Sequence, residues 1–92
     1  MIRSIKNKGL RRFAEKGDAS KLSVQNPDRI RRMLATLDAA TKPEDMNLPG
    51  FGFHGLGGDR KGVYAVSASG NWRMTFEWDG DDAVDVDLED YH

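Results

Sequence analysis

The order of two hydrophobic periods constrains what this chain can fold into more than any other feature. In two segments of the first half, residues 10–14 and 30–37, apolar side chains recur at helical spacing, whereas from Gly62 onward they alternate with polar side chains. The first spacing places apolar residues on one face of a helix, and the second places them on one face of a strand. Helices followed by a run of strands predict an α+β domain, with two N-terminal helices packed on a small, mostly antiparallel β-sheet.

The first half of the chain predicts a short opening strand and two helices. Ile2 and Ile5 indicate the strand, and Gly17 is typical of the end of a first helix. Asn26-Pro27 supplies an N-cap and a first helical residue for the second helix, which we expect to end at Lys42-Pro43. The apolar residues at helical spacing are Leu10, Phe13, Ala14, Ile30, Met33, Leu34 and Leu37.

Three alternating segments in the second half predict an antiparallel meander. They read GVYAVSA, NWRMTFEW and AVDVDLED, and the turn signals Ser69-Gly70 and Asp79-Gly80 separate them. In the middle strand one face carries Trp72, Met74, Phe76 and Trp78, and the other carries Asn71, Arg73, Thr75 and Glu77. In the last strand we expect the inward residues to be Val84, Val86 and Leu88, and the outward ones to be Asp85, Asp87 and Glu89. The terminal triplet Asp90-Tyr91-His92 would then project from a pinned strand.

Length and composition exclude several classes of protein. Ninety-two residues predict one domain over residues 1–92, which is too short for a nucleotide-binding half joined to a substrate half. The chain has no cysteine, so disulfides and thiolate metal sites are excluded. No apolar run approaches the ~20 residues of a membrane span, and the charged opening lacks the apolar stretch of a signal peptide. We therefore expect a soluble, cytoplasmic protein with no membrane contact.

Charge is distributed unevenly along the chain, although the net charge is only −1. Residues 1–42 carry 11 Lys and Arg against 4 Asp and Glu, whereas residues 43–92 carry 3 against 11. A basic half of this size attracts polyanions such as RNA. Patterned charge also keeps small domains soluble, so the asymmetry taken alone favours solvated helix and strand faces.

Five segments together resemble the HigB branch of the RelE-like toxins, bacterial toxin-antitoxin ribonucleases that cut messenger RNA on the ribosome. In order they are MIRSIKNKGL, LATLDAAT, HGLGGDRKG, NWRMTFEW and EDYH, and they extend over nearly the whole chain. Each motif is weak alone, whereas the ordered set is specific. The resemblance implies two helices on a small curved sheet, with no metal or cofactor. It also implies action on messenger RNA in the ribosomal A site, and a HigA-like helix-turn-helix antitoxin as partner.

RNA cleavage needs no cofactor, because the 2′-hydroxyl beside the scissile phosphate is a built-in nucleophile. A protein has to deprotonate it, protonate the leaving 5′-oxygen and stabilise the crowded phosphorane. Imidazole, with its ordinary pKa of ~6.5, suits both proton transfers near neutrality, and the chain has two histidines, His54 and His92. Arg73 offers a forked cation to the phosphate, and Asp90 can orient an imidazole. Tyr91 can stack on a base or donate its hydroxyl to the phosphate.

These residues make up the predicted site. The catalytic set is His54, Arg73, Asp90, Tyr91 and His92, and the substrate-binding set is Asn71, Arg73, Tyr91, Lys8 and Arg12. Which residue is the general base and which the general acid stays open. Counting by twos puts Asp90 and His92 on the face opposite to Arg73. Either a bulge or twist near Glu89 rotates the terminus, or the site lies at a sheet edge where both faces can be reached.

The candidate residues also have structural interpretations, and two other function classes stay open. A lone histidine in a glycine-rich loop is most often a surface residue, and Arg73 can equally be a cross-strand partner of the acidic last strand. A metal enzyme would use His54, His92 and Asp90 as a two-histidine, one-carboxylate set, although no helical pairing of histidines brings them together. A non-catalytic domain would bind RNA through its basic helices and a protein through its acidic strand.

Overall fold

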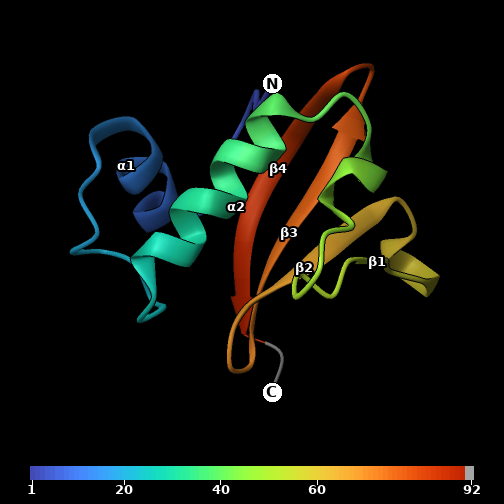
Figure 1. Ribbon diagram of the computed structural model, residues 1–92. Coiled ribbons are helices and arrows are strands. Elements are labelled where there is room, and N and C mark those ends of the chain that lie inside the picture. Colours follow the sequence, from blue (N-terminus) through green and yellow to red (C-terminus); the bar gives the residue numbers. More distant parts are fainter. Residues whose placement is uncertain (91–92) are drawn as a thin grey trace.

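The computed structural model describes residues 1–90, in which two helices lie on one side of a curved, four-stranded sheet (Figure 1). The helices are α1 (Lys8–Lys16) and α2 (Pro27–Ala39), with two short 3-10 helices, η1 (Pro43–Met46) and η2 (Gly58–Arg60). The strands are β1 (His54–Gly55), β2 (Val63–Ser69), β3 (Trp72–Asp79) and β4 (Asp82–Asp90). They pair antiparallel in the order β1-β2-β3-β4. The predicted α+β fold and its meander are confirmed, whereas strand β1 was not predicted.

Capping residues set the ends of both helices much as the sequence predicts. Asn7 and Asn26 each accept a hydrogen bond from a backbone N–H of the first helical turn, which satisfies a donor that the helix itself leaves without a partner. Gly17 ends α1 in the left-handed conformation, with φ at 70°. Helix α2 begins at Pro27 as predicted but ends at Ala39, earlier than expected, because Ala40 is already in the extended conformation.

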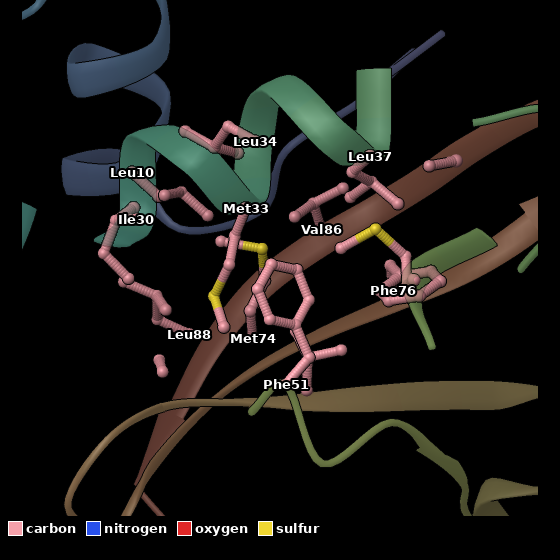
Figure 2. Close-up of a cluster of buried hydrophobic side chains, with 14 of the residues drawn as sticks. Leu10, Ile30, Met33, Leu34, Leu37, Phe51, Met74, Phe76, Val86 and Leu88 are labelled. Atoms are coloured by element: carbon pink, nitrogen blue, oxygen red, sulfur yellow. The ribbon is translucent and has the colours of Figure 1, made fainter. Parts of the chain in front are cut away.

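The apolar faces of α2 and of the sheet meet in one core (Figure 2). The predicted stripe of α2, Ile30, Met33, Leu34 and Leu37, is buried there. From the sheet, Met74 and Phe76 of β3 and Val86 of β4 are fully buried in the same cluster. Trp72 and Trp78, which the sequence places on the same face of β3, pack against its margin and stay half-buried. The helices thus cover one face of the sheet and leave the other face open.

The opening segment pairs with the outer edge of β4. Ile2 bridges Ala83 and Ile5 bridges Val86, both in the parallel orientation, through backbone hydrogen bonds of 2.7 to 3.1 Å. An uncovered strand edge is a template for pairing with other chains. The predicted opening strand therefore exists as two bridges, and it closes the β4 edge of the sheet.

A bulge in β4 overturns the predicted orientation of Val84. From Val84 to Asp87 this strand advances three residues while its partner β3 advances two. Asp85 takes up the extra residue with φ at 52°, in the left-handed region. Val84 consequently pairs with Glu77 and shares its face, and the buried residues of β4 are Ala83, Val86 and Leu88. The inward orientation expected for Val84 was wrong because the alternation of polar and apolar residues does not reveal a bulge.

Candidate active site

A two-residue strand fixes the loop histidine at the edge of the sheet. His54 pairs with Ala65 of β2. Three residues earlier, the carbonyl of Phe51 accepts a hydrogen bond from the Ser67 N–H (2.7 Å), and the Phe51 side chain is buried in the core. The glycine-rich segment is thus anchored to β2 and does not leave the histidine on a loose loop. The alternation of Phe51 and Phe53 with glycine and histidine was the available sequence signal for this pairing.

The strand register places four polar side chains on the open face of the sheet. Directly paired residues of antiparallel strands point to the same face. His54 pairs with Ala65, and Ala65 pairs with Thr75 on the next strand. Arg73, two residues before Thr75 in β3, pairs with Glu89 of β4. His54, Arg73, Thr75 and Glu89 therefore lie on the face that the helices leave uncovered.

Two hydrogen bonds hold His54 in one tautomer. Its Nδ1 lies 3.0 Å from the carbonyl oxygen of Gly52, and its Nε2 lies 3.0 Å from Nη1 of Arg73. A carbonyl oxygen can only accept and a guanidinium N–H can only donate, so the hydrogen sits on Nδ1 and the lone pair on Nε2. A neutral imidazole thus presents its basic nitrogen to Arg73. The His54 side chain is exposed and Arg73 is half-buried, so an anionic ligand can reach both.

A carboxylate beside this pair is held by two donors. The two oxygens of Glu89 accept hydrogen bonds of 2.6 and 2.5 Å from Arg60, and Oε2 also accepts one of 2.5 Å from the Thr75 hydroxyl. The hydrogen bonds from Arg60, followed by that from Thr75, hold the pKa of Glu89 below its ordinary value although burial opposes the shift. Sequence reasoning missed this cluster, since 29 positions separate Arg60 from Glu89.

The last strand stays regular up to Asp90. Pairing runs without interruption from Asp87 to Asp90, so a bulge near Glu89, one of the two alternatives left open by the sequence, does not occur in the described part of the chain. Asp90 pairs with Trp72 and by alternation belongs to the helix-covered face. Asn71 lies in the turn between β2 and β3 instead of in β3, and it borders, with Asp90, a hollow of about 240 Å³. Two further predicted residues, Tyr91 and His92, lie outside the described residues.

Comparison with known proteins bears directly on this geometry. The sequence model of a family described as "RelE-like toxin of type II toxin-antitoxin system HigB" matches residues 3–92. The chain is also 40% identical to Endoribonuclease HigB of Proteus vulgaris over 92 residues, which cover the whole of both chains. The chain belongs to the HigB-like family of RelE-like toxins. The resemblance recognised from the five motifs is thereby confirmed, and membership of a toxin-antitoxin family implies an antitoxin partner.

In this HigB-like toxin the predicted RNA-binding residues of α1 lie away from His54 and Arg73. Helix α1 is on the far side of α2 from strand β1 (Figure 1). Arg12 forms an ion pair with Asp18 and, through its hydrogen bond, lowers the pKa of that carboxyl. Lys8 is exposed. The structure does not bring α1 to the histidine, so any RNA contact of Lys8 or Arg12 involves a different part of the nucleic acid.

Two other basic residues of this HigB-like toxin bind its own backbone. Arg29 of α2 donates to the carbonyls of Gly50 (2.7 Å) and Ser67 (2.8 Å), which ties the loop before β1 to strand β2. Arg11 donates to the carbonyl of Ile5 (2.9 Å) and holds the opening segment. Part of the basic charge in the first half is therefore structural. No local motif marks these bonds, one of which joins residues 38 positions apart.

The described residues of this HigB-like toxin offer neither a three-ligand metal group nor a membrane-spanning helix. Among residues 1–90 no three His, Cys, Asp or Glu side chains come together in a way that could hold a metal ion. The metal alternative also requires His92, which lies outside that range, with His54 and Asp90. No helix in the described part of the chain is long and apolar enough to cross a membrane.

Proposed function

We propose that this toxin is a metal-independent endoribonuclease that cleaves messenger RNA by attack of the 2′-hydroxyl on the adjacent phosphate. The observation that carries the proposal is the pair on the open face, in which the basic nitrogen of His54 lies 3.0 Å from the Arg73 guanidinium. A proton acceptor next to a forked cation suits a reaction that removes a proton and builds negative charge on a phosphate. The relative from Proteus vulgaris, named as an endoribonuclease, matches the full chain.

In the proposed mechanism His54 acts as the general base. When the phosphate binds, Arg73 turns its N–H groups from the neutral imidazole to the charged phosphate oxygens, which are stronger acceptors. The Nε2 lone pair of His54 then takes the proton of the 2′-hydroxyl as the 2′-oxygen attacks phosphorus. Arg73 stabilises the phosphorane. The new bond joins phosphorus to the 2′-oxygen and the bond to the 5′-oxygen breaks, which leaves a 2′,3′-cyclic phosphate and a 5′-hydroxyl.

The leaving 5′-oxygen needs a proton, and we assign its supply to the terminal residues. His92 acts as the general acid, Asp90 holds its imidazole charged, and Tyr91 aligns the base or the phosphate. By alternation Asp90 belongs to the face opposite to Arg73, so the assignment requires a site at the end of the sheet, where both faces can be reached. What supports it is that β4 pairs as far as Asp90, opposite Trp72 and next to Arg73 in β3. We further propose that Asn71, in the turn at this end of the sheet, contacts the RNA.

The terminal assignment is tested by His92→Gln, which keeps the chain length. Loss of a general acid should lower single-turnover cleavage by roughly 10²- to 10⁴-fold. Leu88 is the last core residue in the described part of the chain. We therefore expect the His92→Gln variant to unfold at the same temperature as the wild type. Cleavage by His92→Gln at close to the wild-type rate removes His92 from the mechanism.

We further propose that the message is cut in the ribosomal A site of the cytoplasm and that a HigA-like helix-turn-helix antitoxin silences the toxin. Of the hollows in the described part of the chain, the one lined by Thr75 and Glu89 measures about 260 Å³ and the one lined by Asn71 and Asp90 about 240 Å³, and both are smaller than the roughly 300–1,000 Å³ of pockets that enclose a small molecule. The ribosome would therefore supply most of the contacts that bind and position the message. The basic first half, with Lys8 and Arg12 exposed at its surface, provides cations for ribosomal RNA.

The proposed function is tested by inducing the chain in cells, mapping new RNA 5′ ends with and without translation, and repeating the cleavage on ribosome-bound message in vitro. We expect cuts in translated messages, with 5′-hydroxyl and 2′,3′-cyclic phosphate ends. A message with one 2′-deoxy nucleotide at the cut site should resist cleavage there, because the nucleophile is missing. Cleavage of the deoxy message at the normal rate, or 5′-phosphate ends, would show that an activated water attacks instead.

A further inference from the structure

Glu89 does not bind the cation that stands opposite to it. It pairs directly with Arg73 in the register of β3 and β4. Both oxygens of its carboxylate nevertheless bind Arg60, at 2.6 and 2.5 Å, and Thr75 adds a third hydrogen bond. Arg73 meanwhile donates to His54. In the described part of the chain, Arg60 therefore binds Glu89 and Arg73 binds His54, although Arg73 stands directly opposite to Glu89.

Elementary electrostatics favours the other pairing. Residues directly opposite on antiparallel strands have Cβ atoms about 4.5–5.5 Å apart, and opposite charges in such positions attract each other. A carboxylate is also a stronger acceptor for a guanidinium than a neutral imidazole is. If nothing else bound its oxygens, Glu89 would draw Arg73 away from His54. Arg73 would then reach the phosphate only by breaking an ion pair.

We propose that Arg60 is a positioning residue, which binds Glu89 and thereby keeps Arg73 on His54, ready to turn to the phosphate. The inference rests on the proposed nuclease activity. Arg60 ends η2, in the connection between β1 and β2, so its bond to β4 spans the two central strands of the sheet. Its fork engages both carboxylate oxygens at once, and Thr75, only 2% exposed, fixes one of them from β3.

A plain tether is the competing explanation. Helix η2 has no side-chain cap, so the Arg60–Glu89 ion pair could do no more than hold the β1–β2 connection to β4. The two explanations differ in what happens when both charges are removed. A tether is lost equally in either single variant and in the double variant. In the positioning explanation, loss of Arg60 lets the ionised Glu89 form an ion pair with Arg73. Removing the Glu89 carboxylate as well should therefore return Arg73 to His54 and restore the cleavage rate.

The test compares four variants in single-turnover cleavage of ribosome-bound message: Arg60→Gln, Glu89→Gln, the double variant, and Lys61→Gln as a neighbouring charge control. Displacing a positioned group costs up to about 100-fold in rate, so we expect Arg60→Gln to be roughly 10- to 100-fold slow. Glu89→Gln, Lys61→Gln and the double variant should stay within about threefold of wild type. A double variant as slow as Arg60→Gln, with each protein shown to be folded by thermal unfolding, overturns the proposal in favour of the tether.

A second measurement separates this inference from the nuclease proposal. The ¹⁵N spectrum of His54 in the absence of RNA should show Nδ1 protonated and Nε2 as a hydrogen-bond acceptor in the wild type. Arg60→Gln should move the Nε2 resonance toward that of an imidazole nitrogen without this donor, and the double variant should move it back. If no variant or wild type cuts RNA but the resonance follows this pattern, the nuclease proposal fails and the positioning role stands. A resonance that is identical in all the proteins overturns the positioning role.

Discussion

Replacing Arg73 with lysine separates charge from geometry at the site. Lysine keeps the positive charge, but it is a point charge on a flexible stem where arginine is a planar fork. In the structure the guanidinium donates to Nε2 of His54 at 3.0 Å, and in the proposed transition state two of its N–H groups bind the phosphate. Lysine keeps one of these two bonds. A hydrogen bond to a charged group contributes about 1.5–3 kcal/mol, so the Arg73→Lys variant should cut roughly 10- to 150-fold more slowly.

Alanine at the same position removes both bonds, so Arg73→Ala should lose about 3–6 kcal/mol of transition-state stabilisation, or roughly 10²- to 10⁴-fold in rate. The assay is single-turnover cleavage of ribosome-bound message at saturating toxin, with thermal unfolding of each variant. Arg32→Lys, at an exposed position of α2, is the matched control and should cut at the wild-type rate. An Arg73→Lys variant within about threefold of wild type, or one as slow as Arg73→Ala, would refute the bidentate role.

Three further predictions follow from the geometry. At the β4 bulge, where Asp85 has φ at 52°, Asp85→Gly should be more stable than Asp85→Val by about 1–3 kcal/mol in urea unfolding, because a branched residue is strained there; equal stabilities would refute this. Arg60 lowers the folded pKa of Glu89 below its ordinary 4.5. The ionised Glu89 therefore stabilises the fold above pH 4.5, and this stabilisation is lost as the pH falls through the folded pKa. The free energy of unfolding should therefore decline less between about pH 5 and 3 in Glu89→Gln than in the wild type. An equal decline in both proteins would contradict the lowered pKa of Glu89. If Lys8 and Arg12 contact ribosomal RNA, changing both to Gln should flatten the salt dependence of ribosome binding by about 0.7–0.9 in slope per lost phosphate contact, and an unchanged slope would assign them to solubility.

Local signals in the sequence predicted most of the fold. The Asn26-Pro27 pair marked the start of α2, and two Gly-containing turns delimited the meander, because capping and turn conformations depend on a few adjacent residues. The sequence placed Arg73 on a strand and His54 in a glycine-rich loop, but it did not show that the two side chains meet. Their meeting depends on β1, a strand of only two residues, and on the register that aligns β1 with β2 and β3.

What the sequence could not show depends on contacts between distant segments. The bulge at Asp85 leaves the alternation of residue types intact, yet it changes the face of Val84. The Arg60–Glu89 ion pair joins the β1–β2 connection to the last strand, and Arg29 binds a carbonyl of β2, 38 positions away. Charge counts treat all arginines alike, whereas in the structure Arg11 and Arg29 bind backbone carbonyls, and Arg60 and Arg73 lie at the open face of the sheet.

The most direct measurement of the central claim is the single-turnover rate of His54→Gln on the same ribosome-bound message as the wild type. Glutamine retains hydrogen-bonding capacity beside Arg73 but has no nitrogen basic enough to accept the 2′-hydroxyl proton. With His54 as the general base, the rate should fall by roughly 10²- to 10⁴-fold, while thermal unfolding changes little because the side chain is exposed. A His54→Gln protein that is folded and cuts within about threefold of the wild-type rate would contradict the account.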